Sequence, residues 1–228
     1  MVGQAVGWQN YHEQWLSEGF AQYSAALFAR DRRGEGAFRD VLRQFRRWAI
    51  DQSDQGPIYL GYRLGHLKND SRVFRAVVYN KGAAVLHMLR RLLGDDVFFR
   101  GMRRYYAENR FKKAGTMALR NAMEAESGKS LERFFQRWIF ESGIPRLRYS
   151  TIVEGQELVV RFEQLGPTAE NALYDVPVTV SIHYGDKTVE DVVAVTQASV
   201  EKRFALSGPI RSVEVNADGA ALATLEKR

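Results

Sequence analysis

A carboxylate in an apolar helical stretch is the first candidate for chemistry in this sequence. The segment HEQWLSEGFAQY, residues 12–23, places most of its large apolar side chains on one side of a predicted helix. Glu18 lies among them and is followed directly by Gly19. Because burying a carboxylate beside apolar side chains is costly without a compensating partner, Glu18 is expected to face a charged or hydrogen-bonding group.

The four histidines are the other candidate metal ligands, and their spacing builds no local metal site. The segment HEQWL lacks the second histidine of an H-E-x-x-H pair. His12 and Glu18 would lie on different sides of one helix, so they are not expected to share an ion. His87, in an apolar helical run, is expected to be packed or partly exposed rather than a ligand. His183 is expected on the surface of a strand, and His66, in an irregular loop, stays open.

A helical first part of the chain must position these residues. Apolar periodicity before Pro145 predicts six helices, near 11–31, 36–52, 73–93, 95–109, 116–127 and 130–142. Ser130 is predicted to cap the last of them, whereas Gly128 and Gly143 are predicted to end helices in the left-handed conformation. Segment 53–72 contains Gly, Pro, Asn and Asp and is predicted to be an ordered loop.

After Pro145 the apolar pattern changes to a period of two. Six short alternating runs between residues 146 and 218 predict an antiparallel sheet folded as a sandwich. In one of these runs Val176, Val178, Val180 and Ile182 are expected to face the core. The residues expected to point outward are Pro177, Thr179, Ser181 and His183. Pro177 has no N–H to donate, so it should lie at the start of its strand or on a sheet edge.

These patterns predict an α+β, multi-domain protein. An all-α helical domain is expected at residues 1–145 and a small antiparallel β-sandwich domain at residues 146–228. The second domain carries no constellation of catalytic residue types and is interpreted as structural.

Composition narrows the functional classes. The 228 residues are 45% hydrophobic and 26% charged, as in folded soluble domains, and no run approaches the roughly 20 apolar residues of a membrane helix. Without cysteine, disulfides, thiolate metal sites and a cysteine nucleophile are excluded. The net charge of +6 makes nucleic-acid binding a function to consider. However, the basic residues alternate with apolar ones in predicted amphipathic helices, and no recognition motif accompanies them. We therefore expect no nucleic-acid partner and no membrane partner, and the sequence leaves localisation open.

Three segments resemble the M1 zinc aminopeptidases, which are gluzincin metallopeptidases. WLSEGFAQY resembles the family motif W-L-x-E-G-F-A, and VVYNKGAAVLHMLRRLLG resembles the family's Y-x-K-G segment. The tail LERFFQRWIFESGIP, followed by a β domain, is similar to the end of the catalytic domain and its β-sandwich. The two motifs together, in this order and at this separation, are far more specific than either alone.

The resemblance implies roles for two residues. In that family zinc is held by H-E-x-x-H on one helix and by a glutamate on the next, and Glu18 matches that glutamate. Tyr79 matches the catalytic tyrosine whose hydroxyl stabilises the oxyanion of the tetrahedral intermediate. For the full-length parent, the resemblance implies zinc as cofactor and a peptide substrate hydrolysed by zinc-activated water.

By the family's spacing, the H-E-x-x-H helix would lie before Met1, and so would the G-x-M-E-N segment that binds the substrate's amino group. This chain is therefore expected to be a piece of the parent that binds no zinc and is inactive alone. A non-catalytic binding or scaffolding module derived from the peptidase fold is the alternative. Without the neighbouring zinc helix, part of the Trp15 and Phe20 surface would be exposed, so self-association is also expected.

Overall fold

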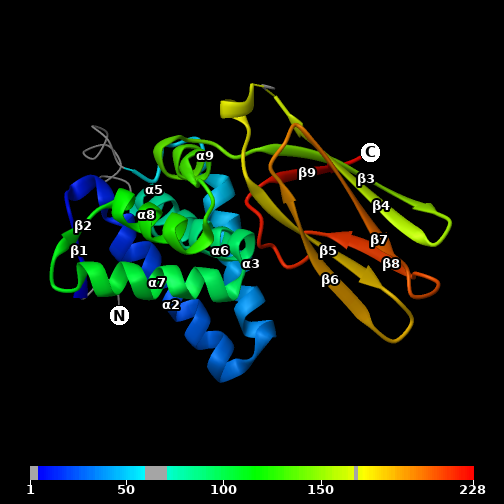
Figure 1. Cartoon of the computed structure of the whole chain (residues 1–228), viewed down its shortest axis with the longest axis horizontal. Helices are drawn as coiled ribbons and strands as arrows, with labels where there is room; N and C mark the ends of the chain where they lie inside the picture. Colours follow the sequence, from blue (N-terminus) through cyan, green and yellow to red (C-terminus); the bar gives the residue numbers. More distant parts are fainter. Residues whose placement is uncertain (1–4, 60–70, 167–168) are drawn as a thin grey trace.

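The computed structural model describes residues 5–59, 71–166 and 169–228 and confirms an α+β architecture. Helices form one half of the molecule and two β-sheets form the other, with the C-terminus on the β side (Figure 1). In the described ranges, no helix combines the length and apolar character needed to cross a membrane.

Three predicted helices, near 36–52, 95–109 and 116–127, are confirmed almost to the residue. The helical elements in chain order are η1 Tyr11–Glu13, α2 Trp15–Arg33, α3 Glu35–Asp51, α5 Ser71–Phe74, η2 Arg75–Lys81, α6 Gly82–Leu93, α7 Asp95–Asn109, α8 Thr116–Ser127, α9 Glu132–Phe135 and η3 Gln136–Phe140. The other three differ internally. The predicted helix 11–31 opens with a separate 3-10 turn, and the predicted helices 73–93 and 130–142 contain the π-helical segments η2 and η3.

The predicted helix ends are confirmed in part. Gly128 ends α8 in the left-handed conformation, with φ +66°, and donates its N–H to the Glu124 carbonyl. Ser130 lies two residues before the start of α9, and its hydroxyl accepts the Glu132 N–H at 3.4 Å, whereas the Leu131 N–H is bound by the Glu124 side chain at 2.7 Å. Gly143 has φ +89° but follows the end of η3, so it does not cap the helix directly.

Two β-sheets follow the helices, and a short parallel pair, β1 Gly7–Trp8 and β2 Lys113–Ala114, lies among them. The main strands are β3 Arg146–Glu154, β4 Glu157–Leu165, β5 Val176–His183, β6 Thr188–Val195, β7 Ser199–Ala205, β8 Ser212–Val215 and β9 Thr224–Lys227. One sheet has the order β7-β4-β3-β9 and the other β6-β5-β8. All six predicted strands are confirmed, and the unpredicted β9 pairs in parallel with β3.

The prediction that one face of β5 points outward is wrong. Thr179 and Ser181 are buried, as is every residue of β5 except His183. The helical half covers this face, because Arg91 of α6 donates to the Thr179 hydroxyl at 2.8 Å. Since alternate side chains of a strand point to opposite faces, Val178 and Val180 then face the other sheet as predicted.

Pro177 is the second residue of β5, in agreement with its predicted place at a strand start. β5 is the middle strand of its sheet, but its pairing with β8 begins only at Val180. The missing N–H of Pro177 therefore disrupts no ladder with β8.

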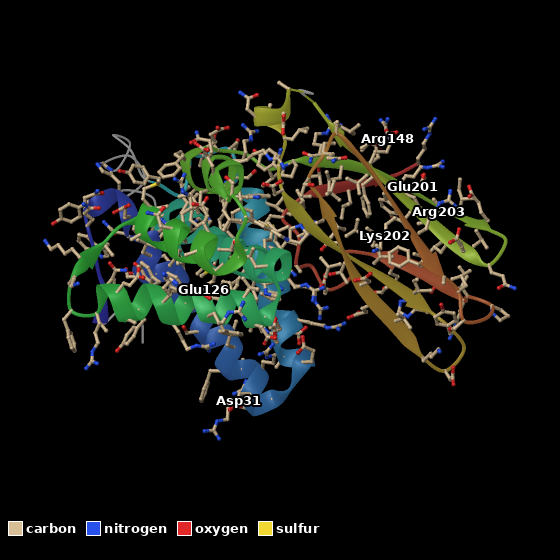
Figure 2. All side chains as sticks on the ribbon, in the orientation of Figure 1. Asp31, Glu126, Arg148, Glu201, Lys202 and Arg203 are labelled. Carbon is tan, nitrogen blue, oxygen red and sulfur yellow. The ribbon has the colours of Figure 1, made fainter. Side chains whose placement is uncertain are left out.

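Surface charges on the β-sheet alternate in sign. Glu201 and Arg203 lie on β7 (Figure 2), and Arg203 contacts the carboxylates of Glu154 and Glu157 at 3.0 and 3.1 Å. Glu201 also binds Arg161 of β4 at 2.6 Å. Pairs of this kind, exposed to water, are typical of a solvated surface rather than of a free basic patch.

Candidate active site

The structure brings Glu18 and Tyr79 together from separate parts of the chain. Glu18 lies in the first turn of α2, and Tyr79 lies in the π-helical segment η2, which packs against α2. The Tyr79 hydroxyl lies close enough to the Glu18 carboxylate for that carboxylate to raise the pKa of Tyr79. The Ser17 hydroxyl lies 3.2 Å from Glu18 Oε1 and 3.0 Å from the Gln14 carbonyl oxygen, so it can donate to one of them at a time. Glu18 therefore faces hydroxyl donors, as its apolar neighbourhood required.

The environment of Tyr79 keeps its hydroxyl protonated. Partial burial raises the pKa of Tyr79, and the hydrogen bond to Glu18 and the negative charge of Glu18 raise it further. The positive charge of Arg75 opposes these effects by lowering the pKa. A neutral phenol is the form that can donate a hydrogen bond to developing negative charge.

A close crossing of α2 and α6 sets this juxtaposition. Each candidate residue has a glycine close to it in the sequence. Gly19 directly follows Glu18, and Gly82 lies three residues after Tyr79. A Cβ added at Gly19 would lie 3.1 Å from the Gly82 carbonyl carbon and 3.3 Å from its Cα. Backbone therefore packs on backbone, and the glycines of the two motifs let Glu18 and Tyr79 meet.

Replacing Gly19 with alanine is expected to destabilise the chain by up to about 2 kcal/mol. The methyl group would press on Gly82 backbone atoms that cannot rotate away, an overpacking cost of about 1–3 kcal/mol that exceeds the roughly 1 kcal/mol gained in helix propensity. Gly36→Ala is the matched control, since a Cβ there meets open space on α3. Urea unfolding should show Gly36→Ala equal to or more stable than wild type. Equal stability of Gly19→Ala and Gly36→Ala would contradict the proposed crossing.

Two contacts with α8 fix the start of α2. Trp15 is buried and donates its Nε1–H to the Thr116 hydroxyl at 3.0 Å. Glu13, also buried, accepts the Thr116 backbone N–H at 2.7 Å and so caps α8. Gly115 leaves room for this cap, because a Cβ there would lie 2.6 Å from Glu13 Oε1. Glu13 therefore has a structural role as the cap of α8, whereas Glu18 remains the candidate residue of the active site.

Lys81 has a structural role that the sequence analysis does not predict. This residue of the VVYNKG segment is fully buried, and its ammonium donates to the Gly143 carbonyl oxygen at 3.2 Å. Burial lowers the pKa of Lys81 to about 8. The lysine therefore anchors η2, and with it Tyr79, to the segment that leads into the β-sheets. A lysine inside an otherwise apolar run was the available signal.

Two of the histidines, His87 and His183, lie as predicted, the first packed in the core and the second partly exposed. His87 is buried, with Nδ1 3.1 Å from the Tyr23 hydroxyl. His12 stacks on Tyr59, with ring centroids 5.4 Å apart, and His183 is partly exposed. His66 lies outside the described residues.

Zinc, which the family resemblance implies, does not find a complete site in the described residues. Within residues 5–59, 71–166 and 169–228, no group of three or more His, Asp or Glu side chains is placed to hold a metal ion. Glu18 is accompanied there by the hydroxyls of Ser17 and Tyr79, and these are not the imidazole and carboxylate donors that zinc prefers.

The expected exposure of Trp15 and Phe20 is wrong. Their exposed fractions are only 1% and 4%. Trp15 packs against Gly82, and the Phe20 ring stacks on Tyr105 with centroids 6.3 Å apart. These two side chains are therefore covered within the chain itself, and self-association stays a prediction.

Sequence comparison finds relatives over most of the chain. The chain is 28% identical to a probable M1 family aminopeptidase 1 of Encephalitozoon cuniculi over 78% of this chain and 21% of that protein. It is 28% identical to an aminopeptidase N of Haemophilus influenzae over 86% of this chain and 24% of that protein. The match to a tricorn protease-interacting factor F2 of Thermoplasma volcanium is 26% identical and covers 78% and 23% of the two chains. The chain thus spans about a quarter of the length of these curated relatives.

The fold has a counterpart among solved structures. It is similar to the aminopeptidase A of Legionella pneumophila in complex with aspartic acid, with a TM-score of 0.79 and 16% sequence identity, over 98% of this chain and 25% of that one. The model of the peptidase family M1 domain matches residues 2–138, which is more than half of the chain. The chain therefore belongs to peptidase family M1.

Proposed function

We propose that the chain is the part of an M1-type aminopeptidase that carries the glutamate and tyrosine side of the active centre. In the longer parent, Glu18 would be one ligand of zinc and Tyr79 would donate to the oxyanion, while the parent hydrolyses peptide bonds. The contact between Glu18 and Tyr79 is the observation that carries this proposal. Family membership and the aminopeptidase names of the relatives support it.

The chemistry of this chain's own residues fits these roles. Glu18 has a carboxylate held by hydroxyl donors rather than by an arginine or lysine ion pair, so it is not tied to a cation in the described structure. Tyr79 has a hydroxyl whose raised pKa keeps the proton in place at neutral pH. The π-helical form of η2 supports the proposal as well, since such segments are frequent at functional sites.

The 228 residues alone are expected to bind no stoichiometric zinc and to show no aminopeptidase turnover. The metal content of the purified chain, after incubation with zinc and gel filtration, tests the first statement. Hydrolysis of aminoacyl p-nitroanilides with added zinc tests the second. The reason is that the described residues supply one family ligand and no complete site.

A matched pair of variants makes this test specific. Glu18→Gln removes the proposed ligand, and Glu226→Gln makes the same change on the exposed strand β9. Zinc-dependent activity in wild type and Glu226→Gln that disappears in Glu18→Gln would refute the expected inactivity of the isolated chain. Background zinc that is equal in all three proteins would agree with it.

A further inference from the structure

A small polar cavity lies where the end of α2 and the helices α3 and α6 meet the β half of the molecule. Its volume is about 190 Å³, below the roughly 300–1,000 Å³ of pockets for drug-sized ligands. Four arginines contribute to its lining: Arg30, Arg39, Arg90 and Arg91. Four carboxylates line it as well: Glu35, Asp95, Glu190 and Asp218. The size of the cavity limits the occupant to a small group, and its charged lining favours a strongly polar one.

Two of the four arginines each hold a carboxylate through two hydrogen bonds, and Arg91 forms a longer ion pair with Asp218. Arg90 donates from Nε and Nη2 to the two oxygens of Asp95, at 2.8 and 2.5 Å. Arg39 donates to both oxygens of Glu190 on β6, at 3.4 and 3.0 Å. These two pairs are neutral overall and form the walls of the cavity.

Each of the other two arginines keeps at least one donor without an acceptor among the described residues. Arg91 donates to the Thr179 hydroxyl at 2.8 Å, and its Nη2 lies 3.8 Å from Asp218, but its Nε–H is buried and has no acceptor in the described part of the chain. Arg30 lies over the ring of Phe38, 5.3 Å from its centroid. Among the described residues, no carboxylate forms an ion pair with Arg30.

His87 supplies a third donor to the cavity. Arg90 can only donate, so the Tyr23 hydroxyl accepts from it at 3.3 Å and keeps its own proton available for His87 Nδ1, which lies 3.1 Å away. The neutral imidazole then carries its proton on Nε2. Glu35 also contributes to the lining, but it lies exposed in the first turn of α3, where water can solvate its carboxylate.

We propose that this cavity binds a small oxyanion of the phosphate type, held by Arg30, Arg91 and His87. Guanidinium groups bind tetrahedral oxyanions through charge-assisted hydrogen bonds, and an oxyanion offers several acceptors to the donors that lack one here. Arg91 is also bound to Thr179 of β5, so the anion would join the helical half to the β half. A ligand that binds only the folded state stabilises it by mass action.

Thermal unfolding in inorganic phosphate tests the proposal, with sodium chloride keeping the ionic strength constant. The melting temperature of wild type should rise saturably with phosphate concentration. Arg30→Gln should need about tenfold more phosphate for half of the effect, the loss expected for one charge-assisted hydrogen bond. Arg32→Gln is the matched control, because Arg32 lies in the same last turn of α2 and pairs with the exposed Asp31. It should respond as wild type does.

A second measurement separates binding from the general stabilising effect of phosphate, which is excluded from protein surfaces. The His87 imidazole resonances in nitrogen-15 NMR should shift saturably at the same phosphate concentration. The pKa of His87, held at about 3 by burial and by Arg91, Arg90 and Arg30 against the opposing Asp95, should rise when an anion binds. A linear rise in melting temperature common to all three proteins, or His87 resonances that do not respond, would overturn the proposal.

Discussion

Acidification from about pH 7 to about pH 4 is expected to destabilise the wild-type chain by about 3 kcal/mol more than the His87→Gln variant. The pKa of His87 is lowered from 6.5 to about 3, first by burial and then by the charges of Arg91 and Arg90. Between these two pH values the unfolded chain binds a proton at this position and the folded chain does not. Stability therefore rises with pH across this window and is lost as the pH falls.

The groups around His87 explain why its imidazole stays neutral in the folded state. The Tyr23 hydroxyl accepts from Arg90 and lies 3.1 Å from His87 Nδ1, so a proton on His87 would add a buried positive charge beside that of Arg90. Gln at this position can still accept from Tyr23 but does not titrate. The variant thus removes the pH dependence while keeping one hydrogen bond.

Urea unfolding at several pH values measures the effect. The free energies of unfolding of wild type and His87→Gln should converge as the pH falls from about 7 to about 4, because the wild type loses more. For His183→Gln, which changes the partly exposed histidine of β5, the free energy of unfolding should depend on pH as it does for wild type. Parallel curves for wild type and His87→Gln would contradict a buried neutral His87.

Trp138→Ala is expected to lower the free energy of unfolding by about 4 kcal/mol, within the range found for large-to-small changes in cores. Trp138 has an exposed fraction of 0% and packs edge-on against Tyr174, with ring centroids 4.8 Å apart. Its Nε1–H donates to the Asp175 carbonyl oxygen at 3.1 Å. The indole therefore fastens η3 to the start of β5, and its loss leaves both a cavity and an unpaired buried acceptor.

Two further tryptophan variants resolve the causes of this loss. Trp138→Phe keeps most of the packing but removes the donor, so it should cost about 1–2 kcal/mol. Trp48→Ala, at a partly exposed position of α3, should cost clearly less than Trp138→Ala in urea unfolding followed by circular dichroism. A smaller loss for Trp138→Ala than for Trp48→Ala would refute the role of Trp138 at the junction.

Much of the fold could be predicted because the spacing of apolar residues indicates which face of a single helix or strand is buried. Helices α3, α7 and α8 and the six strands from β3 to β8 follow directly from the apolar pattern. The pattern does not report what covers an element. Thr179 and Ser181 alternate with valines as an exposed face would, yet α6 lies against them. Likewise, η2 has the composition of an α-helix, and that composition does not predict its π-helical geometry.

The candidate site was predictable in its residues but not in its construction. Glu18 and Tyr79 were found through their resemblance to two family motifs, because neither an apolar stripe nor a lone tyrosine is distinctive. Their contact depends on the close approach of Gly19 and Gly82, which involves residues distant in sequence. The burial of Trp15 and Phe20 was missed for the same reason, since the elements that cover them come from later in the chain.

The packing of η2 on α2 places the Tyr79 hydroxyl beside the Glu18 carboxylate. The most direct test is a pH titration of the Tyr79 carbon-13 ζ resonance in wild type, Glu18→Gln and Glu18→Ala. The pKa of Tyr79 should fall in Glu18→Ala, which loses both the hydrogen bond and the charge, and should fall less in Glu18→Gln, which can still accept the hydrogen bond. The surface change Glu226→Gln should leave it unaltered. An unchanged Tyr79 pKa in Glu18→Ala would show that the two residues do not meet.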